Sequence, residues 1–195
     1  MIDLKKKPFF LDEEACQWVK KTLEGMSDEE KVGQLFCEIL WDRPGREPED
    51  LFEVIEPGGV MYRPFPGEKM HDFSERLQKK AKIPLLISCN LERGGSGGNG
   101  GLTNGTYVAS PMGCAATDDA QAAYDLAAVA CEEGGACGVN WTFEPIIDID
   151  RNPENPITNV RTYGSDPERI LRMAKAYIDA VSYTHLRAHE TTLHL

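Results

Sequence analysis

Hydrophobic and polar residues follow two patterns that alternate along this chain. In one pattern, apolar residues recur every three or four positions, which predicts amphipathic helices. In the other, short uninterrupted apolar runs are flanked by turn residues, which predicts strands buried on both faces. The expected helices cover residues 11–23, 51–55, 67–82, 118–133 and the segment that follows Ser165. The expected strands cover residues 60–62, 83–89 and 141–149.

Capping residues predict where several of these helices begin and end. Ser27 with Glu30 has the spacing of a capping box and opens a short helix, and Ser165 with Glu168 repeats the pattern. Thr117 is expected to cap the helix over residues 118–133, which the glycine pair at 134–135 would end.

Strands that alternate with helices predict βα units on a parallel sheet. In such sheets the chemistry gathers beyond the carboxyl ends of the strands. This chain offers four such ends, namely the region of Glu38, Arg63, the segment 90–92 and the segment 148–151. We therefore look for site residues in these four places.

Composition and charge narrow the classes of partner. The chain has 195 residues, of which 41% are hydrophobic, a composition typical of globular proteins. Its formal net charge is -11. This acidity, with one basic cluster at residues 5–7, argues against nucleic-acid and anionic-membrane partners. No apolar run reaches the ~20 residues of a membrane helix. Acidic residues follow the short apolar run 8–11 directly, so we expect no signal peptide and a cytoplasmic location.

The six cysteines also agree with a cytoplasmic location. No two of them form a C-x-x-C pair, and most lie inside apolar stretches. In a cytoplasmic protein such cysteines are expected to be small buried hydrophobic residues rather than a disulfide framework.

The last fifteen residues differ from the rest of the chain. Residues 181–191 resemble one reading frame of the transposase adapter used for sequencing libraries, so we interpret residues 181–195 as a non-native tail. The alternative is a genuine C-terminal segment rich in histidine. With the tail set aside, His71 is the only histidine. Neither a Ser–His–Asp relay nor a histidine-rich metal site can then be assembled.

A glycine-rich segment at residues 93–101 directly follows an expected strand. Gly95, Gly97 and Gly100 have the spacing of a dinucleotide-binding fingerprint, which requires a helix immediately afterwards. Residues 102–111 instead contain turn-forming residues and show no helical period. We interpret the segment as a mobile active-site loop or a linker. A doubly wound nucleotide-binding domain is kept as a further hypothesis.

Charged residues near the strand ends suggest a site for a polyhydroxylated ligand. Glu92, Asp148 and Asp150 lie close in sequence to expected strand ends, with Arg151 and Arg161 nearby. Each of these side chains can form two hydrogen bonds to neighbouring hydroxyl groups. The alternative is structural, with the two aspartates capping loops and pairing with Arg151.

Four segments, in order and at suitable spacing, resemble glycoside hydrolase family 3. They are residues 27–36, 57–60, 140–157 and 161–167. The resemblance covers residues 25–179 and implies an α/β fold that is a partial (β/α)8 TIM-type barrel, about its first half. On this interpretation residues 1–24 are a helical lead-in and residues 25–180 are the N-terminal half of the catalytic barrel.

The same resemblance implies a function. Residues 155–164 are similar to the β-N-acetylhexosaminidase branch, which implies retaining hydrolysis of β-linked N-acetylhexosamine or related β-glycosides. The partner is then a carbohydrate, with no cofactor and no metal. Arg161 would contact the sugar, and Asn90, where the family usually has Asp, would hold hydroxyl groups. Glu92 and Asp148 complete the expected substrate-binding set.

The catalytic residues implied by the family lie after Arg161 and are not in this chain. We therefore expect a fragment that is inactive by itself and that aggregates through the open edge of its sheet. Three departures from the family pattern are Asn90, Arg93 within the usual Glu-Gly pair, and Glu144 in place of Ala or Ser. They leave two alternatives, a β-glucosidase-type enzyme of the family and a non-enzymatic carbohydrate-binding relative.

Overall fold

The computed structural model describes residues 2–97, 101–183 and 187–188. Its α-helices are α1 Glu13–Gly25, α2 Asp28–Gly33, α3 Gly67–Lys80, α4 Pro111–Ala116, α5 Ala120–Ala136 and α6 Pro167–Tyr183. Its strands are β1 Cys37–Leu40, β2 Gly59–Tyr62, β3 Leu86–Cys89, β4 Trp141–Thr142 and β5 Arg187–Ala188. Two 3-10 helices, η1 Pro48–Glu53 and η2 Asn159–Arg161, complete the elements. The expected alternation of helices and strands is confirmed.

The five strands form one parallel sheet whose spatial order is the order of the chain, β1-β2-β3-β4-β5. In a doubly wound nucleotide-binding sheet the strand order reverses at a switch point. Here each new strand joins the same edge, as in the winding of a (β/α)8 barrel. The predicted α/β class with a parallel sheet is confirmed, and the doubly wound hypothesis is wrong.

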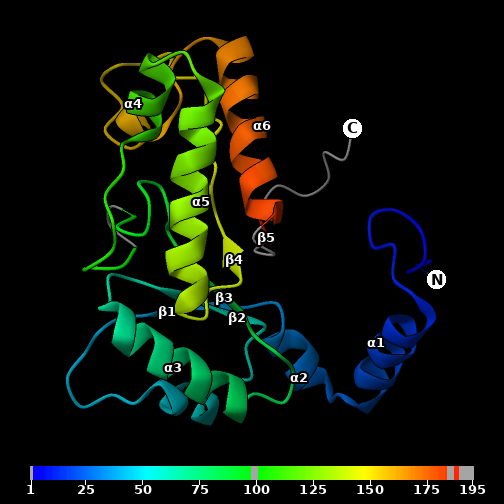
Figure 1. Cartoon of the computed structure of the whole chain (residues 1–195). Coiled ribbons are helices and arrows are strands. Elements are labelled where there is room, and N and C mark those ends of the chain that lie inside the picture. The colour runs from blue at the N-terminus through cyan, green and yellow to red at the C-terminus, as the bar shows by residue number, and fades with distance from the viewer. Residues whose placement is uncertain (1, 98–100, 184–186, 189–195) are drawn as a thin grey trace.

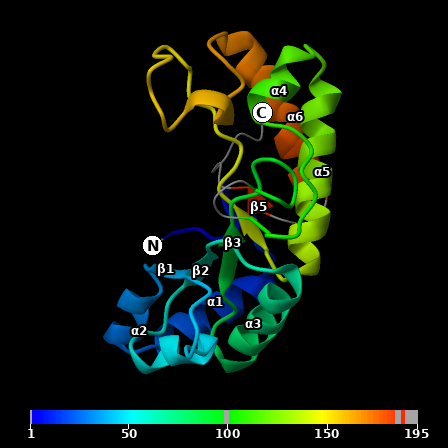
Figure 2. The same ribbon diagram turned by 90° about the vertical axis from the view of Figure 1, so that its left-hand side faces the viewer.

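The buried core lies between the strands and the helices that follow them. Helices α5 and α6 lie side by side in both views, and α3 lies near β1 and β2 (Figures 1 and 2). Fully buried side chains from the strands and from α3 and α5 include Tyr62, Met70, Leu77, Ile87 and Leu126. Burying such side chains stabilises the fold by about 1.5–3 kcal/mol each.

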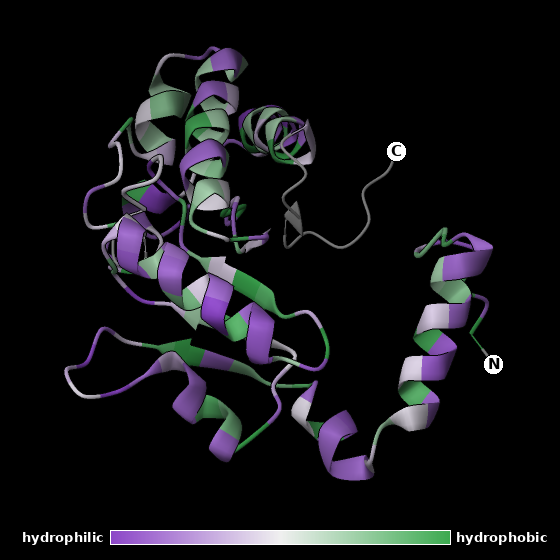
Figure 3. Ribbon diagram, turned by 60° about the horizontal axis from the view of Figure 1, so that its bottom comes forward, coloured by the Kyte–Doolittle hydropathy of each residue, from purple (hydrophilic) through white to green (hydrophobic). Residues whose placement is uncertain are grey.

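Helix α1 stands apart from the sheet and is joined to it through α2 (Figures 1 and 3). Its buried residue is Cys16, whereas Trp18 and Leu23 are exposed. Asp12 caps α1, and the capping box of Ser27 and Glu30 opens α2 as predicted. Five of the six cysteines are buried, as expected, and Cys37 is exposed. Within the described residues no helix has the length and apolarity needed to cross a bilayer.

The predicted strand over residues 141–149 is wrong beyond its second residue. Strand β4 ends at Thr142, and Ile147 is 60% exposed. Pro145 has no backbone N–H to donate to a neighbouring strand, so the ladder cannot continue through it. The apolar run after Thr142 therefore forms a loop.

The predicted ends of α5 and α6 also need correction. Asp119, not Thr117, caps α5, and the helix continues through Gly134 to Ala136. Gly134 fits there because a Cβ at this position would lie only 3.0 Å from Leu91 Cδ1, so the glycine lets α5 approach the loop after β3. At α6, Asp166 Oδ1 accepts from the Glu168 N–H, so Asp166 caps the helix in place of the predicted Ser165.

The proposed non-native tail lies only partly within the described residues. Helix α6 extends to Tyr183 and buries Val181, and residues 187–188 pair with β4. Residues 184–186 and 189–195 lie outside the described part of the chain. The interpretation of residues 181–195 as adapter-derived stays a prediction.

Candidate functional site

A cavity of about 570 Å³ opens beyond the carboxyl ends of β2, β3 and β4. It is lined by Met61, Arg63, Asn90, Glu92, Arg93, Phe143, Pro156, Ile157 and Arg161. Arg63 follows β2, Asn90 and Glu92 follow β3, and Phe143 follows β4. This is the edge at which a parallel sheet gathers its functional side chains, and three of the predicted site residues meet there.

An ion pair between Arg161 and Glu92 forms one wall of this cavity. Arg161 Nε donates to Glu92 Oε2 over 2.8 Å and Nη2 donates to Oε1 over 2.7 Å, which is a bidentate arrangement. Asn90 Nδ2 also donates to Glu92 Oε1, over 3.0 Å. Glu92 is only 4% exposed. The hydrogen bonds to Glu92 raise the pKa of Arg161 above the ordinary value of an arginine.

The backbone between Asn90 and Glu92 is held by two buried side chains. The Leu91 N–H donates to Glu144 Oε2 over 3.2 Å, and the Tyr177 hydroxyl donates to the Leu91 carbonyl over 3.3 Å. The Thr142 hydroxyl also donates to Glu144 Oε2. Residues from the end of β4 and from α6 thereby fix the segment that carries Asn90 and Glu92.

Glu144 is a buried acid with an unusual proton affinity. Complete burial raises its pKa to about 7, the Thr142 hydrogen bond opposes the rise, and the charge of Glu92 adds to it. Both donors converge on Oε2, whereas Oε1 is buried without a partner in the described part of the chain. The geometry therefore favours Oε1 as the oxygen that holds the proton.

The glycine-rich segment packs against the site. The Ser96 N–H donates to the Thr106 carbonyl over 3.1 Å, and the Thr106 N–H donates to Glu133 Oε2 over 2.8 Å, so Thr106 ties the segment to α5. Gly97 has a φ of +55°, and a Cβ placed there would lie 1.9 Å from the Asn90 carbonyl oxygen. α4, the next helix, begins at Pro111, well beyond the glycines. The described part of this segment thus supports the backbone of Asn90 rather than opening a helix.

Replacing Gly97 with alanine is expected to destabilise the chain by about 2 kcal/mol, because the new Cβ meets the Asn90 carbonyl and a left-handed φ disfavours side chains. Urea unfolding measures the effect. Gly135→Ala is the matched control, since a Cβ there meets nothing within 4 Å. We expect Gly135→Ala to be neutral or slightly stabilising, because alanine favours a helix more than glycine does. Equal effects of the two substitutions would contradict the packing argument.

Asp148, the fourth predicted site residue, lies elsewhere. It is exposed and does not line the cavity, although its charge acts on Arg161. Its predicted position depended on a strand that the chain does not form. Its contact with a sugar stays a prediction.

Sequence reasoning did not assign a role to Arg63, Arg93 or Glu144. The strand-end rule did indicate the place of Arg63, but no pattern in the sequence assigned this arginine a role. Arg93 and Glu144 stood out as departures from the family pattern. Among the described residues, no three His, Cys, Asp or Glu side chains form a group that could hold a metal ion.

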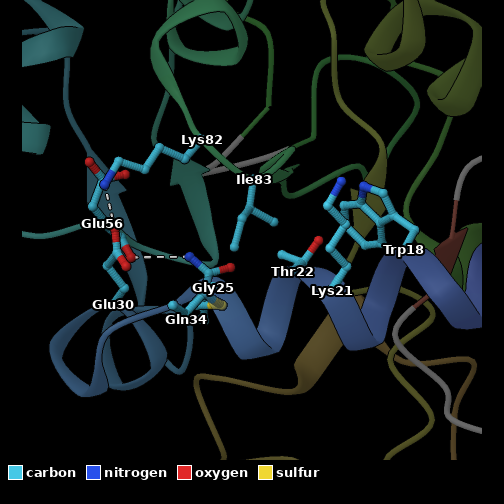
Figure 4. Close-up of a pocket in the computed structure, with 10 residues that line it drawn as sticks. Trp18, Lys21, Thr22, Gly25, Glu30, Gln34, Glu56, Lys82 and Ile83 are labelled. Atoms are coloured by element: carbon cyan, nitrogen blue, oxygen red, sulfur yellow. Dashed lines mark hydrogen bonds and ion pairs between the residues drawn. The ribbon is translucent and has the colours of Figure 1, made fainter.

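A second cavity, of about 420 Å³, lies at the amino ends of the strands (Figure 4). Trp18 and Thr22 of α1 line it opposite Ile83, which precedes β3. Several of its polar groups pair with one another, because Lys82 forms an ion pair with Glu30 and Gln34 Nε2 donates to the Glu56 carbonyl over 3.2 Å. This end of a parallel sheet serves stability more often than chemistry, so we assign the candidate site to the first cavity.

The family to which this chain belongs follows from its match to a known domain. The model of the glycosyl hydrolase family 3 N terminal domain matches residues 29–191, which is most of the chain. The chain belongs to glycosyl hydrolase family 3. The resemblance noted in the sequence is thereby confirmed, and the cavity lies within the matched part of this family 3 chain.

Three similar proteins in the family have names that refer to different activities. A β-N-acetylglucosaminidase/β-glucosidase of Cellulomonas fimi is 39% identical over 188 residues, which are 96% of this chain and 33% of the relative. A solved structure of the β-glucoside phosphorylase BglX bound to 2FGlc is 62% identical, with a TM-score of 0.92, and covers 95% of this chain and 33% of that chain. A family 3 β-N-acetylglucosaminidase from Paenibacillus sp. str. FPU-7 is 27% identical, with a TM-score of 0.72, over 84% of this chain and 32% of that chain. The chain thus spans about a third of the length of each of these relatives.

Proposed function

We propose that this chain is the sugar-binding part of a retaining glycoside hydrolase that acts on β-linked N-acetylhexosamine or related β-glycosides. The Arg161–Glu92 pair with Asn90 at the carboxyl ends of the strands carries the proposal. The 39% identical relative is named for both activities, on β-N-acetylglucosaminides and on β-glucosides. In this proposal the nucleophile and the acid/base come from a part of the protein beyond Arg161.

The site offers hydrogen bonds that suit a sugar. Because the Asn90 amide nitrogen donates to Glu92, its Oδ1 is left to accept a hydrogen from a sugar hydroxyl. Two hydrogen bonds to Glu92 and one from Nη1 to the Ile157 carbonyl, over 3.3 Å, hold the Arg161 guanidinium in place, so its remaining N–H groups have fixed directions. Phe143 and Ile157 supply apolar surface for the carbon face of a ring.

A second candidate function is phosphorolysis of β-glucosides. The 62% identity to a protein named β-glucoside phosphorylase favours it. In this reaction the bond from the anomeric carbon to the aglycone oxygen breaks and a phosphate oxygen bonds to that carbon. The aglycone oxygen receives the proton. The substrate-binding site would be the same, and only the acceptor would differ.

A kinetic experiment tests both functions in a protein that carries this chain together with the rest of a family 3 catalytic domain. We expect turnover of an aryl β-N-acetylglucosaminide or an aryl β-glucoside. If hydrolysis is the reaction, adding phosphate leaves the rate unchanged, and if phosphorolysis is the reaction, phosphate raises it and yields a sugar 1-phosphate. Asn90→Ala should lower kcat/KM by about tenfold or more, since it removes a hydrogen bond made to the substrate. Gln17→Ala on α1 removes an exposed amide and serves as the control.

Binding of the glycoside without any turnover, with or without phosphate, would contradict both candidate functions. That outcome would support the alternative of a non-enzymatic carbohydrate-binding relative. Equal loss of kcat/KM in Asn90→Ala and Gln17→Ala would contradict the assignment of the cavity.

We also propose a cytoplasmic location. The six cysteines, all present as free thiols and five of them buried, support it, because a reducing compartment keeps such thiols reduced. Fractionation of the source cells tests the location, and recovery of the protein outside the cytoplasm would contradict it.

A further inference from the structure

The cavity has a charge opposite to that of the chain. The chain carries a formal charge of -11, yet three arginines line the cavity, Arg63, Arg93 and Arg161, against one carboxylate, that of Glu92. Since Arg161 and Glu92 pair with each other, Arg63 and Arg93 leave two positive charges unbalanced in the lining. A positively charged cavity on a strongly acidic protein attracts negatively charged ligands.

Arg63 and Arg93 differ from the paired arginines of the chain. Arg76 bonds to three carboxylates, and Arg172 pairs with Asp118. Within residues 2–97, 101–183 and 187–188, the Arg63 and Arg93 side chains form no hydrogen bond and no ion pair, and the Nε of each is buried without a partner. The Arg63 guanidinium lies over the ring of Trp41, 5.6 Å from its centroid. Buried donors without acceptors are costly, so a ligand that supplies acceptors would bind well here.

The fold brings the two arginines together. Arg63 follows β2 and Arg93 lies four residues beyond the end of β3, and these strands are paired in the sheet. Paired strands lie about 4.8 Å apart, so side chains that leave their carboxyl ends can reach one ligand. Both arginines line the same cavity as Asn90, next to the proposed sugar position.

We propose that Arg63 and Arg93 form a phosphate subsite beside the sugar pocket. A guanidinium is a planar fork that matches the oxygens of a phosphate, and two forks balance the two charges of a phosphate dianion better than the single charge of a carboxylate. Inorganic phosphate and the phosphate group of a sugar phosphate share this chemistry. The proposal uses the cavity of the proposed function but does not depend on which reaction occurs there.

Equilibrium binding tests the subsite in a protein that carries this chain together with the rest of a family 3 catalytic domain, because the chain alone is expected to aggregate. The probes are inorganic phosphate, glucose 1-phosphate and methyl β-glucoside, measured by calorimetry with wild type, Arg63→Gln, Arg93→Gln and the double variant. We expect each single substitution to weaken phosphate binding at least tenfold and the double variant to abolish it. Arg43→Gln removes the same charge from an exposed position outside the cavity and should change the affinity less than twofold.

Two further measurements control for folding and identify the source of the phosphate group. Circular dichroism reports whether each variant is folded, and if a glutamine variant fails to fold, Arg63→Lys and Arg93→Lys retain the charge without the fork. We expect the lysine variants to bind phosphate three- to tenfold more weakly than wild type. Tighter binding of glucose 1-phosphate than of phosphate assigns the subsite to a sugar phosphate. Equal or weaker binding assigns it to free phosphate.

The outcomes separate this proposal from the proposed function. Absence of phosphate binding by folded wild type, or unchanged affinity in both Arg63→Gln and Arg93→Gln, would overturn the subsite. If the glucoside still binds in that case, the sugar site stands without the phosphate subsite. Phosphate binding that depends on both arginines, with no binding of the glucoside, would support the subsite and contradict the proposed function.

Discussion

Replacing Arg161 with methionine is expected to lower the free energy of unfolding by about 3 kcal/mol, because it leaves the buried carboxylate of Glu92 without its partner. Glu92 would lose two hydrogen bonds, of 2.8 and 2.7 Å, and would keep only the one from Asn90. Water could compensate only in part, since Glu92 is 4% exposed. Urea unfolding at neutral pH measures the loss, and binding of methyl β-glucoside should be lost with it.

The matched control for this prediction is Arg172→Met. Arg172 pairs with Asp118, but both side chains are well exposed, and an exposed pair contributes about 1 kcal/mol or less. The double variant Arg161→Met with Glu92→Gln should recover part of the loss, because it removes the unpaired charge. If Arg161→Met and Arg172→Met cost the same, the burial of the Glu92 charge is not what stabilises the site.

Glu144 is expected to make the stability of the chain depend on pH. Its pKa is about 7 in the folded chain against an ordinary 4.5, so the folded state holds the proton over a range in which the unfolded state has lost it. The stabilisation is therefore complete below pH 4.5 and is lost as the pH rises through 7. At about 1.4 kcal/mol for each pKa unit, the loss is on the order of 3 kcal/mol.

Comparing wild type with Glu144→Gln isolates this effect from other titrations. The amide keeps an oxygen that can accept from Leu91 and Thr142, but it does not titrate. The stability of wild type relative to Glu144→Gln should fall between pH 4.5 and pH 8 and then become constant. Glu154→Gln removes an exposed carboxylate and controls for the loss of one formal charge. A parallel pH dependence of wild type and Glu144→Gln would contradict the prediction.

One rule from the sequence indicated Asn90 and Glu92 as candidate site residues, and both line the cavity. Asn90 and Glu92 follow a strand that its apolar run made plain, and parallel strands gather their carboxyl ends at one edge. Arg161 was indicated by the family resemblance, and it meets Glu92 across 69 positions of sequence. The same rule also indicated the strand end at Arg63, which lines the cavity, although the sequence assigned that arginine no role.

The rule failed where the strand assignment failed. An apolar run of residues 141–149 is compatible with a buried strand, and hydrophobic periodicity cannot tell a strand from an apolar loop over so short a stretch. Pro145 was the signal against a long strand. Because β4 ends at Thr142, Asp148 falls on an exposed loop and does not line the cavity.

The sequence by itself determined the kinds of element, their order and the family, because these depend on local periodicity, capping residues and motifs. Only the tertiary structure decided the pairing of Arg161 with Glu92, the burial of Glu144 behind Leu91 and the positive lining formed by Arg63 and Arg93. These features join residues that are distant in the chain. Their charges and proton affinities depend on burial, and no local pattern specifies which side chains fold against one another.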